Sequence, residues 1–126
     1  MSRITGVGLD IIEIERIRHS CARFGNRFLE RIYTDEERRY CFAKKNPYPS
    51  LAVRFAAKEA FAKAIRLGTD NTLAWTDVSV QAGPKGIPEL KLADFLAEGL
   101  KGFELHLSLS HSHLFANAVV IIERRG

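Results

Sequence analysis

The stretch Arg54–Ile65, with the sequence RFAAKEAFAKAI, constrains the fold most, because it predicts a helix that has no purely polar side. At 100° per residue, one smooth side suited to close packing is formed by four of its five alanines, at 56, 57, 60 and 64. Glu59 and Lys63 are four residues apart, as are Arg54 and Lys58, and both pairs border apolar residues. One interpretation is a surface helix whose charged side chains lay their stems on the core. The other is a helix that carries a functional set of charges.

The segment Ile4–Ile11 alternates as a β-strand does, with apolar residues on one face and Gly6, Gly8 and Asp10 on the other. The two glycines leave room for a ligand or for another backbone to approach closely. An Asp at the end of a strand can hold a hard cation through its oxygens. The alternative is that Asp10 and Glu13 form a capping box for the next helix, since helix caps are commoner than metal ligands.

The segment Phe103–Ser112 predicts a half-buried strand that runs into a turn, and Leu114–Ile122 predicts a second, more buried strand. The run Ser110–His113 then lies at the tip of a hairpin, where functional residues are commoner than within strands. Ser110 and His111 do not predict a nucleophile and its base, because adjacent residues of a strand point to opposite faces.

The pattern over the whole chain predicts one α+β domain over residues 1–126, with a mostly antiparallel sheet packed on one long helix. We expect a first strand over 4–10, and short strands near 78–80 and 89–92 with a turn at 83–86. We expect helices over 11–24, 27–32, from the Thr34 capping box to about 45, from a Ser50 cap to about 68, and over 93–101.

Composition excludes several classes of protein. The chain is 46% hydrophobic and 27% charged, as in ordinary globular proteins. Cys21 and Cys41 lack the spacing of a zinc or redox pair, so we interpret both as packing residues. No apolar stretch approaches a membrane span, and the first residues lack the apolar region of a signal peptide. We therefore expect a cytoplasmic protein without a membrane partner.

The net charge of +4, from 19 basic and 15 acidic residues, favours an acidic partner, and arginines are concentrated in the first third of the chain. We do not expect that partner to be nucleic acid, because acidic residues interrupt the basic region and no set of stacking aromatics accompanies it. From charge alone, a solvated face remains an equal interpretation.

Taken in order, these segments resemble the holo-acyl-carrier-protein synthase family of 4'-phosphopantetheinyl transferases. The matching motifs are G-V-G-L-D at 6–10, R-F-A-A-K-E-A-F-A-K-A at 54–64, W-T-D-V at 75–78, G-x-P at 86–88 and L-S-L-S-H-S at 107–112. The resemblance covers nearly the whole chain and includes the α+β fold of that family. It implies transfer of the 4'-phosphopantetheine arm of coenzyme A to a serine of an acidic apo acyl carrier protein, in fatty acid or polyketide synthesis. It also implies a homotrimer with active sites between subunits.

The resemblance assigns the chemistry to Asp10, Glu59 and Lys63. Asp10 and Glu59 match ligands of magnesium, with manganese as an alternative, and Lys63 matches a lysine near the phosphates. A metal-bound water, or Glu59 acting through a water, is favoured as proton acceptor over Lys63, because a lysine among phosphates stays protonated. The alternative from another class is a binding module for coenzyme A or the carrier without turnover. The intact carboxylate pair argues against that alternative.

The resemblance also assigns binding residues. Besides Lys63, those that match coenzyme A contacts are Arg54, Lys58, Gly86, Pro88, Ser110 and His111, with His111 near the 3'-phosphate. Those nominated for docking of the carrier protein are Arg16, Arg23 and Arg27. The chain departs from the family at Arg66–Asn71, where it has one glycine and an added acid instead of a G-T-G turn. His106 and His113 match no motif, and we interpret them as ordinary strand and turn residues.

Overall fold

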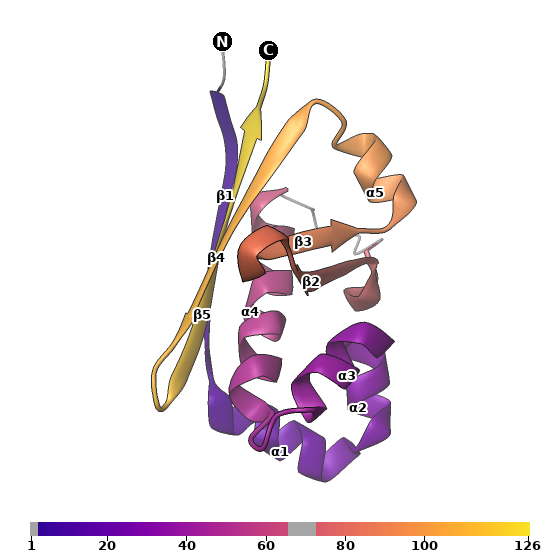
Figure 1. Ribbon diagram of the computed structural model, residues 1–126, viewed down its shortest axis with the longest axis vertical. Helices are drawn as coiled ribbons and strands as arrows, with labels where there is room; N and C mark the ends of the chain where they lie inside the picture. Colours follow the sequence, from indigo (N-terminus) through magenta and orange to yellow (C-terminus); the bar gives the residue numbers. More distant parts are fainter. Residues whose placement is uncertain (1–2, 66–72) are drawn as a thin grey trace.

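The computed structural model describes residues 3–65 and 73–126, and Figure 1 shows the arrangement of its elements. The expected departure at Arg66–Asn71 lies outside the described residues. In chain order the elements are β1 (Arg3–Glu13), α1 (Ile14–Phe24), α2 (Asn26–Ile32), α3 (Asp35–Phe42), α4 (Tyr48–Ala64), the 3₁₀ turn η1 (Trp75–Asp77), β2 (Val78–Ala82), the 3₁₀ turn η2 (Pro84–Gly86), β3 (Pro88–Leu92), α5 (Asp94–Gly99), β4 (Phe103–His111) and β5 (Phe115–Arg124).

The strands form two antiparallel sheets around α4. The larger sheet has the order β1-β5-β4, and β2 pairs only with β3. In Figure 1, α4 lies along one face of the larger sheet, with α1–α3 beside one end of the helix and the β2–β3 hairpin beside the other. The predicted α+β fold around one long helix is confirmed, and the hairpin forms a separate sheet.

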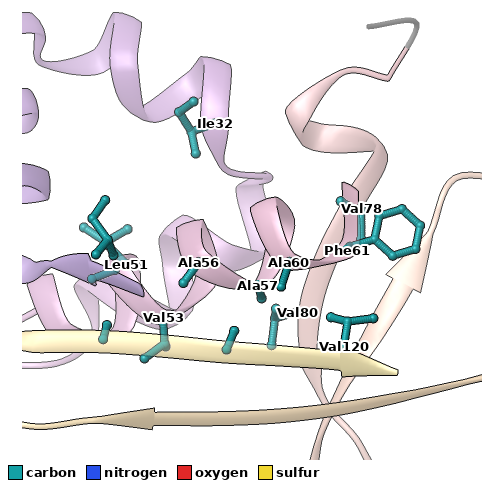
Figure 2. Packing of buried hydrophobic residues seen from close by; sticks show 14 of the residues in the cluster. Ile32, Leu51, Val53, Ala56, Ala57, Ala60, Phe61, Val78, Val80 and Val120 are labelled. Carbon is teal, nitrogen blue, oxygen red and sulfur yellow. The ribbon is translucent and has the colours of Figure 1, made fainter. Parts of the chain in front are cut away.

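Helix α4 is the centre of the core. Its fully buried residues include Leu51, Ala56, Ala60 and Phe61, and they pack with alternate residues of β5 such as Val120 (Figure 2). The interpretation of this stretch as a surface helix is therefore wrong. Two of its charged residues, Arg54 and Lys58, are buried as well.

The backbones of β1 and α4 are in direct contact, which explains the two glycines of the first motif. A Cβ added at Gly6 would overlap the carbonyl oxygen of Ala64, and one added at Gly8 would overlap that of Ala60. The space beside these glycines is thus filled by another backbone and not by a ligand. Asp10, the next residue on this face, lies directly beyond the contact.

Gly8→Ala is expected to lower the free energy of unfolding by ~3 kcal/mol, because the added methyl group forces α4 away from β1. Chemical denaturation followed by far-UV circular dichroism measures this change. Gly99→Ala is the matched control, since a Cβ there meets no atom within 4 Å. A denaturation midpoint for Gly8→Ala equal to that of the control would contradict the contact.

Two predicted helix starts are wrong. Strand β1 continues to Glu13 because it pairs with β5 along its whole length, so Asp10 lies in the strand and caps no helix. Glu13 holds the cap position of α1 without a side-chain hydrogen bond. Helix α4 begins at Tyr48, with Pro49 in its first turn, where no backbone N–H is required, so Ser50 lies inside the helix.

The face of the larger sheet opposite α4 carries an apolar row on β1. The side chains of Val7, Leu9 and Ile11 are 58%, 63% and 62% exposed, whereas Gly8 on the other face contacts α4. We call these three residues the β1 apolar row. Separately, none of the described helices is both long and apolar enough to cross a membrane.

Candidate active site

Asp10, Glu59 and Lys63 come together where β1 runs beside the C-terminal half of α4. The Lys63 ammonium donates to the Leu9 carbonyl at 2.9 Å and to Asp10 Oδ1 at 3.3 Å. Burial and then the negative charge of Asp10 raise the pKa of Glu59, and Lys63 partly opposes this shift. The fold therefore places two carboxylates and one ammonium, separated by about 50 residues of sequence, within electrostatic reach of one another.

A cavity of about 540 Å³ opens beside Glu59. Its wall is mainly apolar, and Trp75 on that wall stacks on Phe55 with ring centres 4.9 Å apart. The residues that line the cavity are Arg31, Lys58, Glu59, Ala62, Leu73, Ala74, Trp75 and Val78. Glu59 thus borders a space that is lined by apolar residues and by the basic residues Arg31 and Lys58.

A second cavity, of about 200 Å³, collects five of the residues predicted to bind coenzyme A: Arg54, Gly86, Pro88, Ser110 and His111. They come from α4, the η2–β3 segment and the end of β4, three parts of the chain that are far apart in sequence. The guanidinium of Arg54 lies 4.4 Å from the centre of the Tyr40 ring and donates to the Ser50 carbonyl at 3.2 Å. Its buried Nε has no hydrogen-bond partner among the described residues.

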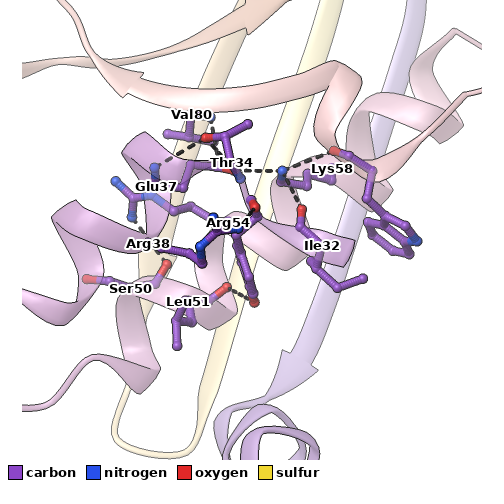
Figure 3. Close-up of polar contacts among 11 residues, drawn as sticks. Ile32, Thr34, Glu37, Arg38, Ser50, Leu51, Arg54, Lys58 and Val80 are labelled. Carbon is purple, nitrogen blue, oxygen red and sulfur yellow. Dashed lines mark hydrogen bonds and ion pairs between the residues drawn. The ribbon is translucent and has the colours of Figure 1, made fainter. Parts of the chain in front are cut away.

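Lys58 occupies a different environment from the one predicted. Its ammonium donates to Glu37 Oε1 at 2.7 Å, to the Ile32 carbonyl at 2.7 Å and to the Trp75 carbonyl at 3.0 Å (Figure 3). Burial lowers the pKa of Lys58, and the Glu37 carboxylate opposes that shift. All three ammonium hydrogens are donated to the protein, so the predicted phosphate contact of Lys58 finds no support in this geometry.

The two cavities lie on different sides of α4. Arg54 and Glu59 are five residues apart, which corresponds to about 140° around a helix. No described residue lines both cavities. Asp10 lies on β1 at one edge of the larger sheet, and His111 lies on β4 at the other edge. The predicted site residues therefore form two groups, which a single copy of the chain does not bring together.

The three arginines predicted to dock the carrier protein are all exposed: Arg16 and Arg23 on α1 and Arg27 on α2. Helix α1 buries Ile14 and Ile17, which leaves its basic side in solvent. Arg18, on the same helix, is engaged within the protein, since it pairs with Glu15 at 2.8 Å and lies over the Tyr48 ring.

Sequence reasoning missed the roles of Glu37 and Trp75. The sequence predicts only a capping box of Thr34 for this segment, and the structure confirms it. The Glu37 N–H donates to Thr34 Oγ1 at 3.2 Å, and the Thr34 N–H donates to the Glu37 carboxylate at 3.0 Å. The same carboxylate also holds Lys58, 21 residues later, and no local pattern encodes that contact. The sequence motif W-T-D-V includes Trp75 but does not predict that its ring lines a cavity. The chain has one tryptophan, and that rarity is the feature of the sequence that could have pointed to this residue.

A group of three metal-type side chains, Glu104, His106 and Glu123, lies elsewhere on the larger sheet, with ligand atoms within 4.8 Å of one another. His106 Nε2 lies 3.1 Å from Glu123, and Arg125 pairs with Glu104. These contacts account for the cluster without a metal.

Comparison with known proteins agrees with the fold. A model of the 4'-phosphopantetheinyl transferase superfamily matches residues 6–121, so the chain belongs to that superfamily. It is 48% identical over 118 residues to the holo-[acyl-carrier-protein] synthase of Chlamydia trachomatis serovar L2, an alignment that covers 94% of this chain and 98% of the relative. The family predicted from the sequence is confirmed.

Solved structures of the same kind superimpose on the chain. The holo-[acyl-carrier-protein] synthase of Neisseria meningitidis matches with a TM-score of 0.85 and 33% identity, covering 95% of this chain and 98% of that one. The Helicobacter pylori protein, solved in complex with coenzyme A, matches with a TM-score of 0.81 and 34% identity, covering 92% and 98%.

Proposed function

We propose that this protein is a holo-[acyl-carrier-protein] synthase, which transfers the 4'-phosphopantetheine arm of coenzyme A to a serine of apo acyl carrier protein and releases adenosine 3',5'-bisphosphate. The observation that carries the proposal is the meeting of Asp10, Glu59 and Lys63 beside a cavity of suitable size. The relatives bear this name, and the Helicobacter pylori protein binds coenzyme A.

Asp10 and Glu59 fit a magnesium ion, with manganese as an alternative. Both offer the carboxylate oxygens that these cations prefer, and the charge of Asp10 opposes ionisation of Glu59, a repulsion that a bound cation relieves. When bound, the metal would polarise the phosphoryl group under attack and neutralise charge on the leaving group.

The side chains near the reacting phosphate have distinct roles in this proposal. The side chain of Lys63, which donates to Asp10, stabilises the negative charge that develops on the phosphate oxygens. Glu59, whose pKa is raised, accepts the proton of the carrier serine through a water. The apolar wall around Trp75 holds the phosphopantetheine arm, and Arg31 lies at its rim.

The cavity that contains Arg54, Gly86, Pro88, Ser110 and His111 accepts the adenosine 3',5'-bisphosphate half of coenzyme A in this proposal. The unpartnered Nε of Arg54 supports a phosphate contact there. Because this cavity and the carboxylate pair lie on different sides of α4, we place the nucleotide half on one copy of the chain and the carboxylates on the next.

A cyclic homotrimer satisfies this arrangement. A head-to-tail ring brings the β4 edge of one sheet to the β1 edge of its neighbour, and with them His111 to Asp10. The β1 apolar row supplies a surface that association would cover. Two observations thus support a trimer with three sites between subunits: the strand order of the larger sheet and the exposed β1 apolar row. We further propose a cytoplasmic enzyme of lipid metabolism, with fatty acid biosynthesis as its pathway.

Arg16→Glu is expected to raise the KM for acyl carrier protein by about tenfold and to leave the affinity for coenzyme A unchanged, since reversing an exposed charge opposes an acidic partner. Steady-state kinetics with each substrate varied in turn measures the two effects. Lys101→Glu is the control, because Lys101 is also exposed but lies between α5 and β4, away from α1. An equal loss of coenzyme A affinity would remove Arg16 from carrier docking.

The proposed function is tested by the intact mass of an apo acyl carrier protein incubated with this protein, coenzyme A and magnesium. Parallel samples contain a chelator or the Asp10→Ala variant. A mass gain of one phosphopantetheine arm in the complete mixture alone supports the transferase and its metal requirement. Binding of coenzyme A without any mass gain on several carriers would favour the binding module instead.

A further inference from the structure

The most deeply buried ion pair among the described residues joins Glu37 of α3 to Lys58 of α4. The side chains are 0% and 1% exposed, and their charged atoms lie 2.7 Å apart. Glu37 accepts three further hydrogen bonds, from the Thr34 N–H at 3.0 Å, the Thr34 hydroxyl at 3.4 Å and the Val80 N–H at 3.0 Å. Burying two charges costs several kcal/mol, and only a complete set of partners offsets that cost, which this pair has.

The contacts of the pair converge on one wall of the cavity beside Glu59. Lys58 precedes Glu59 in α4 and donates to the carbonyl of Trp75, whose ring stacks on Phe55. Glu37 accepts a hydrogen bond from the N–H of Val80, in the middle of β2. The pair thus ties η1 and β2, which carry the wall, to α4, which carries the carboxylate.

We propose that Glu37 and Lys58 are positioning residues, which fix the Trp75 wall at a set distance from Glu59 so that the cavity is formed before the coenzyme arrives. Lys58 then acts through the Trp75 carbonyl and touches no phosphate. The identity of the ligand in this inference, the arm of coenzyme A, rests on the proposed function. The preformed wall itself rests on the contacts described above.

Two variants distinguish a positioning role of Lys58 from a purely structural role. Lys58→Met leaves the Glu37 carboxylate buried without its counter-ion, so we expect strong destabilisation. Lys58→Met combined with Glu37→Gln removes both charges, and we expect it to recover most of the lost stability. The double variant still lacks the donor to the Trp75 carbonyl. A structural role predicts that function returns with stability, whereas a positioning role predicts that it does not.

The experiment measures binding of coenzyme A and of adenosine 3',5'-bisphosphate by calorimetry. Fluorescence of Trp75, the only tryptophan of the chain, is recorded with iodide as quencher on the ligand-free protein. For the double variant we expect coenzyme A affinity to fall by about tenfold. We also expect unchanged affinity for the bisphosphate and greater quenching of Trp75. Lys101→Met serves as the control for loss of a lysine at an exposed site.

Parental coenzyme A affinity and quenching in the folded double variant would overturn the inference. An equal loss of affinity for both ligands would also overturn it, because that pattern indicates a direct phosphate contact of Lys58. Failure of the proposed function is distinguishable, since it appears in the parent protein: either the parent binds neither ligand, or it binds coenzyme A and modifies no carrier protein. In that case the quenching of Trp75 fluorescence still tests whether Glu37 and Lys58 hold the wall in place without ligand.

Discussion

Glu59→Gln is expected to lower the rate of transfer at least ~1000-fold while leaving the fold intact, because an amide cannot supply the charge that a divalent cation and the proton transfer require. The fold should even gain stability at neutral pH. Burial and Asp10 raise the pKa of Glu59 above its ordinary value of 4.5, so the folded protein holds that proton more tightly than the unfolded chain does. Ionised Glu59 therefore costs stability, and this cost appears as the pH rises through its raised pKa.

The carrier mass assay measures the rate, and thermal unfolding at pH 7 and below pH 4.5 measures the stability. We expect Glu59→Gln to unfold at or above the parental temperature at pH 7, with the difference shrinking in acid. Glu30→Gln, an exposed change on α2, is the control and should match the parent. Near-parental turnover of Glu59→Gln at saturating magnesium would remove Glu59 from the mechanism.

Val7→Lys is expected to convert the proposed trimer to folded monomers and to reduce transfer at least ~100-fold, since each site needs groups from two copies. Val7 is 58% exposed in the single chain, so a lysine there is compatible with the monomer fold. In a trimer that covers the β1 apolar row, the same lysine places unpaired charges in the interface. Light scattering coupled to gel filtration gives the oligomeric state, and the carrier assay gives the activity.

Phe95→Lys is the matched control for Val7→Lys. Phe95 is equally exposed, at 59%, but lies on α5 and not on the larger sheet. This variant should keep both the oligomeric state and the activity of the parent. Fully active monomers of Val7→Lys would contradict the placement of the sites between subunits.

Local sequence patterns predicted most elements of the fold. The Thr34 capping box, the hairpin of β4 and β5 and the strands near Val78 and Val80 depend on neighbouring residues, so the chain encodes them directly. The predicted hairpin tip at Ser110–His113 is displaced, because pairing with β5 extends β4 through His111. The errors arose where a partner far away in sequence decides the outcome. Strand β1 passes Asp10 because β5 pairs with it to Glu13, which no pattern near residue 10 could reveal.

The candidate site divides in the same way. Asp10, Glu59 and Lys63 were found through residue type and motif, and the fold brings them together. The environment of Lys58 was not predictable, because its partners lie in α2, α3 and η1. A lysine in a helix is usually exposed, so the sequence predicts an exposed Lys58. Only the tertiary structure shows that the buried Glu37 carboxylate binds its ammonium group.

The main-chain contact of Gly6 and Gly8 with α4 also affects how far substitutions elsewhere in the protein can alter the candidate site. The spacing of Asp10 and Glu59 is set by two backbones in direct contact, with no intervening side chains whose size could alter it. We therefore expect substitutions of large core residues, such as Ile17 or Leu51, to have little effect on the distance between the two carboxylates. The geometry of the candidate site therefore depends little on the sequence of the surrounding core and depends directly on two residues that have no side chain.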